Sequence, residues 1–200
     1  MADTLVHFVA RDRAPHPSVP EVIKVMSPDE RMAAILRQGR INPFPTFTDH
    51  PAVCMTECSG VGLEFLISRR GYRPWGLMFD RQAVFDAGGG PVWYVRDEDM
   101  AELATPRLRR WAVRLGENSD WLEEREWRVP RDLVDGSAPS IPLADLGFFG
   151  VIVGERNWWC PVPARGVDGT EPPWQEQVDD ALQGLQKHWW DPQSEQLILL

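Results

Sequence analysis

The chain has few cysteines and no long apolar run, and both absences narrow what it can be. Its 200 residues include three cysteines, Cys54, Cys58 and Cys160, and an odd count argues against the disulfide framework of a small secreted domain. No apolar run approaches the roughly 18 residues that a membrane span needs, and no signal-peptide pattern opens the chain. We therefore expect a cytoplasmic protein with no membrane partner.

The signatures of several common enzyme classes are also missing. Residues 88–90, GGG, precede a strand-like run and do not open a helix, so they fit a turn better than a dinucleotide fingerprint. No nucleophile elbow surrounds a serine, and Cys58 has neither a helix start nor a paired histidine near it. Cys54 and Cys58 have His50 as their sole nearby companion, whereas a structural zinc site normally needs four ligands. We expect no bound metal.

Charge and aromatic content restrict the choice of partner. The formal net charge is −9, so the field of the whole chain repels nucleic acid, and any such binding needs a local basic patch. Arginines at 69–73 and at 107–114 are two candidates, although each group also fits the polar face of a helix. Ten tryptophans predict either a Trp-filled core, which we favour, or aromatic walls around a planar ligand.

Apolar periodicity predicts several short strands and a few helices. Strands are expected at residues 5–9, 52–56, 75–79, 91–95, 148–153 and 198–200. A capping Ser27, followed by Pro28 and by Glu30 three residues after the cap, predicts a helix that ends at Gly39. Further helices are expected at 62–70, at 100–115 with an interruption near Thr105 and Pro106, and at 171–186.

The order of these elements indicates an α+β protein and not a doubly wound sheet. No linker rich in Gly and Ser divides the chain, and its length suits one well-buried core. We therefore expect a single domain. Residues 5–160 are predicted to form the core, and residues 161–200 a C-terminal helix and tail.

Residues 121–130, WLEEREWRVP, set three glutamates between two tryptophans. If residues 124–129 are extended, Glu124, Glu126 and Arg128 share one face of the strand. Two carboxylates aimed at one place suit a general acid, a general base or a grip on sugar hydroxyls. A solvated edge strand or helix end, with Glu and Arg side chains paired at the surface, explains the same residues.

Two resemblances to known families add to this reading. Residues 5–8, LVHF, followed by residues 34–41, AILRQGRI, resemble the entry to ADP-ribosyltransferase-like folds, particularly the DarT-like group that modifies nucleic acid. A second resemblance, to the abortive-infection Gi family and its relatives found beside phage-defence genes, is carried by residues 51–57, 72–80, 91–94 and 121–128.

The resemblance implies a mixed, split β-sheet core with flanking helices and NAD as the substrate. His7 matches the polar residue on the first strand that holds the nicotinamide-side ribose. Thr56 matches the middle motif, with Tyr72 as the alternative. Arg73 is a candidate for neutralising the NAD pyrophosphate or a nucleic-acid phosphate, although a solvated helix end is the explanation that we favour.

The same resemblance separates the two glutamates. Glu126 matches the carboxylate that orients the ribose 2′-hydroxyl and stabilises the oxocarbenium-like charge as nicotinamide leaves. Glu124 is expected to position the acceptor. Trp127 is expected to supply an aromatic wall for the nicotinamide ring.

The implied function is that of an NAD-dependent ADP-ribosyltransferase acting on nucleic acid or protein. The expected setting is a toxin or phage-defence system with a cognate antitoxin or toxin as partner. Two alternatives remain open. One is a non-catalytic antitoxin or phage sensor that keeps the fold and binds a partner through a Trp-rich surface. The other is a metal-assisted nuclease using Glu57, Glu124 and Glu126.

Several of these residues also have purely structural explanations. His7 can be a strand histidine bonded to a backbone carbonyl. Thr56 and Glu57 can cap the helix that follows them, and Tyr72 can be a core residue.

Overall fold

A computed structural model of the chain describes residues 3–13, 15, 17, 19–45, 50–57, 59–103, 105–116, 121–160 and 184–200. Its centre is a nine-stranded mixed sheet. The path of neighbouring strands runs through β13 (Gln196–Leu199), β12 (Gln186–Asp191), β11 (Phe148–Val153), β5 (Gly76–Asp80), β1 (Thr4–Phe8), β4 (Pro51–Thr56), β9 (Glu126–Pro130) and β6 (Gly90–Pro91). A ninth strand, β3 (Phe44–Pro45), pairs with β4 beside this path.

Two small sheets and a set of short helices complete the fold. The small sheets pair β2 (Arg40–Ile41) with β10 (Ile141–Pro142), and β7 (Trp93–Arg96) with β8 (Ala112–Leu115). The helices are α1 (Glu21–Lys24), α2 (Pro28–Gln38), α3 (Gly60–Arg70), α4 (Arg81–Asp86), α5 (Asp97–Met100), α6 (Pro106–Arg109), and the 3₁₀ turns η1 (Leu122–Glu124) and η2 (Ala144–Leu146). The α+β prediction is confirmed.

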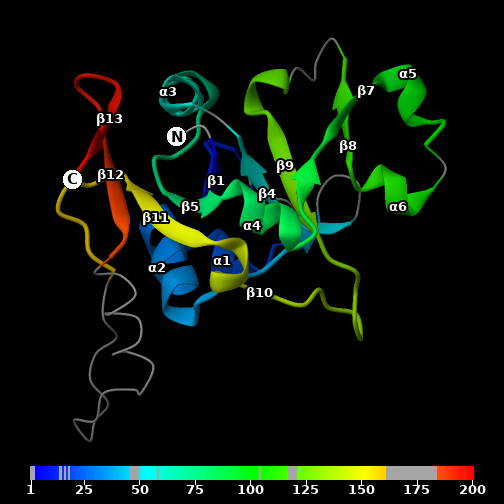
Figure 1. The fold of residues 1–200 in the computed structure, drawn as a ribbon, viewed down its shortest axis with the longest axis horizontal. Helices are drawn as coiled ribbons and strands as arrows, with labels where there is room; N and C mark the ends of the chain where they lie inside the picture. Colours follow the sequence, from blue (N-terminus) through cyan, green and yellow to red (C-terminus); the bar gives the residue numbers. More distant parts are fainter. Residues whose placement is uncertain are drawn as a thin grey trace, which may run out of the picture.

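The hydrophobic core lies on both faces of the central sheet. Met32 of α2 belongs to one cluster with Leu5 of β1, and Leu63 of α3 belongs to a second cluster with Val6 of β1. Successive residues of a strand point to opposite faces, so β1 is covered on both sides. Helices α2 and α3 accordingly lie on opposite sides of the sheet (Figure 1).

The predicted helix after Ser27 is confirmed. The Glu30 carboxylate accepts a hydrogen bond from the Ser27 backbone amide at 2.8 Å, and Gly39 ends the helix at φ 60°. This left-handed backbone conformation favours glycine. Helix α3 also matches its prediction, but Ser59 caps it and accepts from the Gly62 amide at 3.3 Å.

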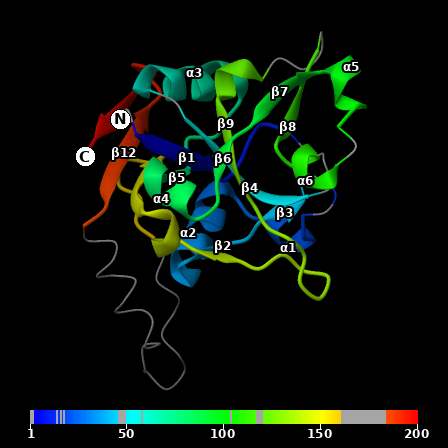
Figure 2. The same ribbon diagram turned by 45° about the vertical axis from the view of Figure 1, so that its right-hand side comes forward.

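The predicted helix at 100–115 is wrong. The chain instead forms α5, α6 and then strand β8, which pairs in parallel with β7 and buries Ala112 and Val113. Pro106 explains the break, because proline has no amide hydrogen for a helix interior and suits a first helical turn. This subdomain lies at the end of the molecule away from β12 and β13 (Figure 2).

The end of the chain adds two strands to the central sheet. Strand β12 pairs in parallel with β11, and β13 pairs antiparallel with β12. The predicted helix at 171–186 lies outside the described residues except for its last residues, of which Gln186 begins β12. A strand at the C-terminus was expected, and β13 contains residues 198 and 199 of it. Within the described part of the chain, no helix is long and apolar enough to cross a membrane.

The central sheet is nearly interrupted between β1 and β4. These strands share one registered pair, Val6 with Thr56, whereas β1 forms five pairs with β5 and β4 forms five with β9. Beside this pair, the ring nitrogen Nδ1 of His7 donates a hydrogen bond to the Cys54 carbonyl at 2.8 Å. A side chain therefore takes the place of a ladder bond at the point where the two strands stop pairing.

Two histidines, the buried His188 and the partly buried His7, make the fold sensitive to mild acid. His188 on β12 is 8% exposed, and its Nδ1 has no hydrogen-bond partner among the described residues. Burial lowers the pKa of His188 and, against the raising effect of the Cys54 bond, the pKa of His7. The native protein therefore holds both rings neutral at a pH where the unfolded chain protonates them.

We expect the free energy of unfolding to be highest above about pH 6.5 and to fall as the pH drops below it. Each histidine contributes a slope of at most about 1.4 kcal/mol per pH unit. Denaturant unfolding between about pH 7.5 and about pH 5.5 measures this, and His188→Leu should remove part of the slope. The same slope in wild type and variant would contradict the account of His188.

Candidate functional site

A cleft of about 1140 Å³ opens beside the gap between β1 and β4. Its lining includes His7 from β1, Thr56 from β4 and Glu126 from β9, which are three neighbouring strands of the sheet. Residues of α1, α2 and η1 close the other sides. Ligand pockets typically measure about 300–1,000 Å³, so the cleft can hold a ligand larger than most drugs.

His7 presents a hydrogen-bond acceptor to this cleft. Because a carbonyl oxygen can only accept, the bond to Cys54 places the proton on Nδ1. The lowered pKa keeps the ring neutral, so Nε2 carries a lone pair. The structural explanation for His7, a bond to a backbone carbonyl, is therefore confirmed, and the same bond orients the ring within the cleft lining.

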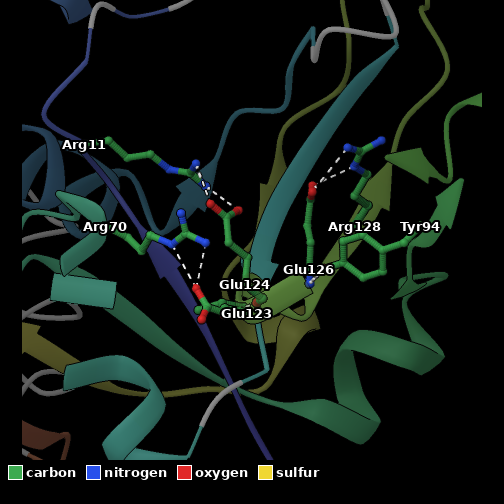
Figure 3. A network of polar contacts seen from close by, with 8 residues as sticks. Arg11, Arg70, Tyr94, Glu123, Glu124, Glu126 and Arg128 are labelled. Carbon is green, nitrogen blue, oxygen red and sulfur yellow. Dashed lines mark hydrogen bonds and ion pairs between the residues drawn. The ribbon is translucent and has the colours of Figure 1, made fainter. Parts of the chain in front are cut away.

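Glu124 and Glu126 both line the cleft, but the expected reason for it is wrong. Strand β9 begins at Glu126, Glu124 belongs to the turn η1, and Arg125 between them has a left-handed φ of 43°. The two carboxylates therefore reach the cleft from a turn and a strand end, not from alternate positions of one strand. In Figure 3 both side chains rise toward the same side from the start of β9.

Each glutamate has its own arginine (Figure 3). Arg11 Nη1 and Nη2 lie 3.0 Å from the two oxygens of Glu124, whose exposed fraction is 6%. Arg128 Nε lies 2.7 Å and Nη2 3.3 Å from the oxygens of Glu126. The charge of each acid is thus compensated by its own guanidinium group, which also fixes the orientation of the carboxylate.

Arg128 is the most buried charged side chain at the site, with 1% of its surface exposed. Its Nη1 donates to the carbonyl oxygens of Arg110 at 2.9 Å and Ala112 at 3.2 Å, which ties β9 to the segment leading into β8. Burial alone would lower the pKa of Arg128, but the neighbouring Glu126 and Cys54 side chains together raise it. The guanidinium is permanently charged, and it compensates the charge of Glu126 within the cleft lining.

Thr56 and Tyr72 support the turn that carries Glu124. The Thr56 hydroxyl donates to the backbone carbonyl of Glu124. The guanidinium carbon of Arg11 lies 4.0 Å from the centre of the Tyr72 ring, a cation–π distance. Burial raises the pKa of the Tyr72 phenol, and Glu124 adds to the rise although Arg11 opposes it. Tyr72 is therefore neutral, and it is both a core residue and part of the cleft wall.

Trp127 does not line the cleft, contrary to the prediction for its ring. It points to the opposite face of β9, is 7% exposed in the core, and its Nε1 donates to Glu57 at 3.2 Å. Trp121 lines the cleft instead, with the Arg13 guanidinium 5.4 Å from its ring centre. Trp121 was one of the two tryptophans noted beside the glutamates, but the wall was assigned to Trp127. Sequence reasoning did not single out Arg11 or Arg13; the signal available was the pair of arginines just after the first strand.

Arg73 belongs to a second, adjoining cleft. It forms an ion pair with Asp12 at 2.5 Å, and both line a cleft of about 620 Å³. Arg73 therefore does not line the cleft that contains Glu126, so any phosphate that it binds lies in the second cleft. Arg70, from the same arginine group, pairs with the exposed Glu123 at 2.7 Å.

The third glutamate of the nuclease alternative lies elsewhere. Glu57 accepts from Arg81 at 2.9 Å and from Arg125 at 3.3 Å, and it is not part of the cleft lining. Over the residues that the structure describes, no group of three His, Cys, Asp or Glu side chains could hold a metal ion.

Cys58 lies outside these residues. Burial, with the Glu126 charge, raises the pKa of Cys54, which therefore stays a thiol.

Comparisons of the chain with protein-family models, with curated proteins and with solved structures found no match.

Replacing Arg128 by alanine should cost about 3–5 kcal/mol of unfolding free energy, because it leaves a largely buried Glu126 and two carbonyls without their donor. Arg70→Ala is the matched control. It breaks an exposed pair with Glu123 and should cost about 1 kcal/mol or less. Denaturant titration of both variants measures the difference, and equal losses would show that Arg128 is not a structural anchor.

Proposed function

We propose that the chain is an NAD-dependent ADP-ribosyltransferase with the split-sheet fold of that class, acting in a toxin or phage-defence setting. The observation that carries the proposal is the convergence of His7, Thr56 and Glu126 on one cleft from three neighbouring strands. These are the three positions that the resemblance assigns to the enzyme's motifs. The cleft also lies beside the gap between β1 and β4, as a split-sheet core requires.

Glu126 is proposed to drive cleavage of the nicotinamide–ribose bond. Its carboxylate accepts a hydrogen bond from the ribose 2′-hydroxyl and stabilises positive charge at the anomeric carbon. The bond between that carbon and the pyridinium nitrogen breaks, and nicotinamide leaves with the bonding electrons as a neutral molecule. A nucleophile of the acceptor then forms the new bond to the anomeric carbon and loses a proton.

The neighbouring residues bind and orient the substrate. His7 Nε2 is an acceptor for a ribose hydroxyl, and Arg128 holds the Glu126 carboxylate in a fixed orientation through two hydrogen bonds. Glu124 is assigned to the acceptor side. A carboxylate has about four acceptor positions, so Glu124 can accept from a substrate donor while Arg11 remains bound. Trp121, in place of Trp127, is the aromatic wall available to the nicotinamide ring.

Nicotinamide release from NAD tests this proposal. Wild-type protein should release nicotinamide in the presence of DNA, RNA or cell lysate as a source of acceptor. Glu126→Gln should lower the rate about 100-fold to 1000-fold, because it removes the negative charge opposite the developing cation.

Glu123→Gln is the matched control, since it makes the same change three residues away on an exposed side chain paired with Arg70. Its rate should equal that of wild type. Undiminished release by Glu126→Gln, or no release by wild type with any acceptor source, would defeat the assignment.

A non-catalytic binding module is the second candidate. Both cleft carboxylates are already bound by arginine, and Trp159 and Trp93 are 70% and 48% exposed, which suits a protein-binding surface. A stable stoichiometric partner captured from phage-infected cells, together with silent NAD assays, would favour this antitoxin or sensor function over the enzyme.

A further inference from the structure

Strand β13 is an unprotected edge of the central sheet. It ends the path of neighbouring strands beside β12 (Figure 1). The other end of the path is β6, Gly90–Pro91, and the side strand β3 is Phe44–Pro45. Both are two residues long and contain proline, and these features keep a sheet edge from pairing with another chain. Residues 196–200, QLILL, contain neither proline nor lysine.

The register of β13 shows which of its backbone groups face outward. The Leu200 amide donates to the Lys187 carbonyl at 2.8 Å, so the backbone groups of Leu200 point toward β12. Hydrogen-bonded positions alternate along an antiparallel pair, and the groups of Leu197 and Leu199 therefore point away from β12. The Leu197 amide agrees with this, because it donates to Glu64 of α3 at 3.2 Å. Leu199 thus presents both its N–H and its C=O at the open edge.

Apolar side chains flank this edge on both faces of the sheet. Leu197 packs against the core cluster that contains Leu63 of α3, and Leu199 shares its face because side chains alternate along a strand. Ile198 and Leu200 are on the opposite face, and all three residues from 198 to 200 are exposed. Neither face is protected by a charged side chain of β13 itself.

Helix α3 adds to the apolar surface beside the edge. Its Glu64 reaches the Leu197 amide, which brings this part of the helix next to β13. Val61 and Phe65, one helical turn apart, are both exposed. Exposed apolar side chains beside an unprotected strand edge indicate an interaction surface.

The β13 edge is complementary to itself. In an antiparallel pair, two residues directly opposite exchange both of their backbone hydrogen bonds at every second position. A two-fold axis at Leu199 therefore lets this residue exchange both bonds with Leu199 of a second copy, and it places Ile198 opposite Leu200 of that copy. Residues 196–200 carry no charged side chain, so two chains of net charge −9 meet at an uncharged segment. Two-fold dimers are also the commonest symmetric assemblies.

We propose that β13 pairs antiparallel with β13 of a second copy of the chain, so that the central sheet continues across a two-fold dimer. Leu199 lines neither cleft, and β12, β11 and β5 separate β13 from β1. The dimer is therefore independent of the enzymatic assignment, and each can fail without the other.

Sedimentation velocity of the full chain, from micromolar to submillimolar concentration, tests the proposal. Wild type should approach twice the 22.8 kDa of one chain as the concentration rises. Leu199→Lys and Leu199→Glu should each raise the dissociation constant of the dimer about tenfold or more, because like charges then stand directly opposite across the axis. An equal mixture of the two variants should associate again, because position 199 then faces its opposite charge.

Leu133→Lys is the matched control. It makes the same change on the segment after β9, at a leucine that is 58% exposed compared with 63% for Leu199. Its dissociation constant should equal that of wild type. Equal weakening by Leu133→Lys and Leu199→Lys would overturn the proposal, as would a mixture of the Lys and Glu variants that associates no better than either alone. A monomeric wild type throughout the range would also overturn it, and is the result expected if the edge receives a strand of a different protein.

Leu199→Pro separates backbone pairing from side-chain contact. Proline has no amide hydrogen, and the Leu199 amide is not part of the ladder with β12. The variant should therefore keep the circular dichroism spectrum of wild type, while the loss of one intermolecular donor from each copy raises the dissociation constant about tenfold. A folded variant that dimerises as tightly as wild type would contradict pairing through β13.

Discussion

The cleft depends on side chains that form hydrogen bonds with backbone groups where β1 and β4 stop pairing. A gap in a buried sheet leaves carbonyl and amide groups without ladder partners, and each unsatisfied group costs about 1–3 kcal/mol. The His7 ring donates to the Cys54 carbonyl, and the Thr56 hydroxyl donates to the Glu124 carbonyl. The first bond satisfies a β4 carbonyl at the gap, and the second fixes the turn η1 that carries Glu124. Each of them positions one wall of the cleft.

The arginines at the cleft determine its geometry more than the stability of the fold. Buried ion pairs gain little net free energy, because both partners lose their hydration, yet removal of one partner is costly. Arg128 and Arg11 each place a rigid, forked donor group against one carboxylate. Both acids are therefore held in defined orientations facing a common space, as the proposed reaction through a short-lived cation would require.

Features that depend on residues close together in the sequence were predicted from the sequence. The cap and stop signals around α2 and the apolar run of β11 depend on neighbours in sequence, and both were predicted from the sequence. The turn at Arg125 was not predicted, because a non-glycine residue with positive φ gives no reliable sequence signal. The burial of Trp127 in the core was also missed. It depends on the pairing of β9 with β4, which decides which face of β9 is buried. Glu126 lines the cleft, and its predicted catalytic role stays a prediction. The pairing of Arg11 with Glu124 joins residues 113 positions apart in the chain, so no local pattern could reveal it.

A crystal structure of the protein with a non-hydrolysable NAD analogue tests the central claim most directly. The account predicts the analogue in the cleft between β1 and β4, with the nicotinamide-side ribose between His7 and Glu126 and its 2′-hydroxyl donating to the Glu126 carboxylate. An empty cleft at saturating analogue, or a ligand bound away from Glu126, would contradict it.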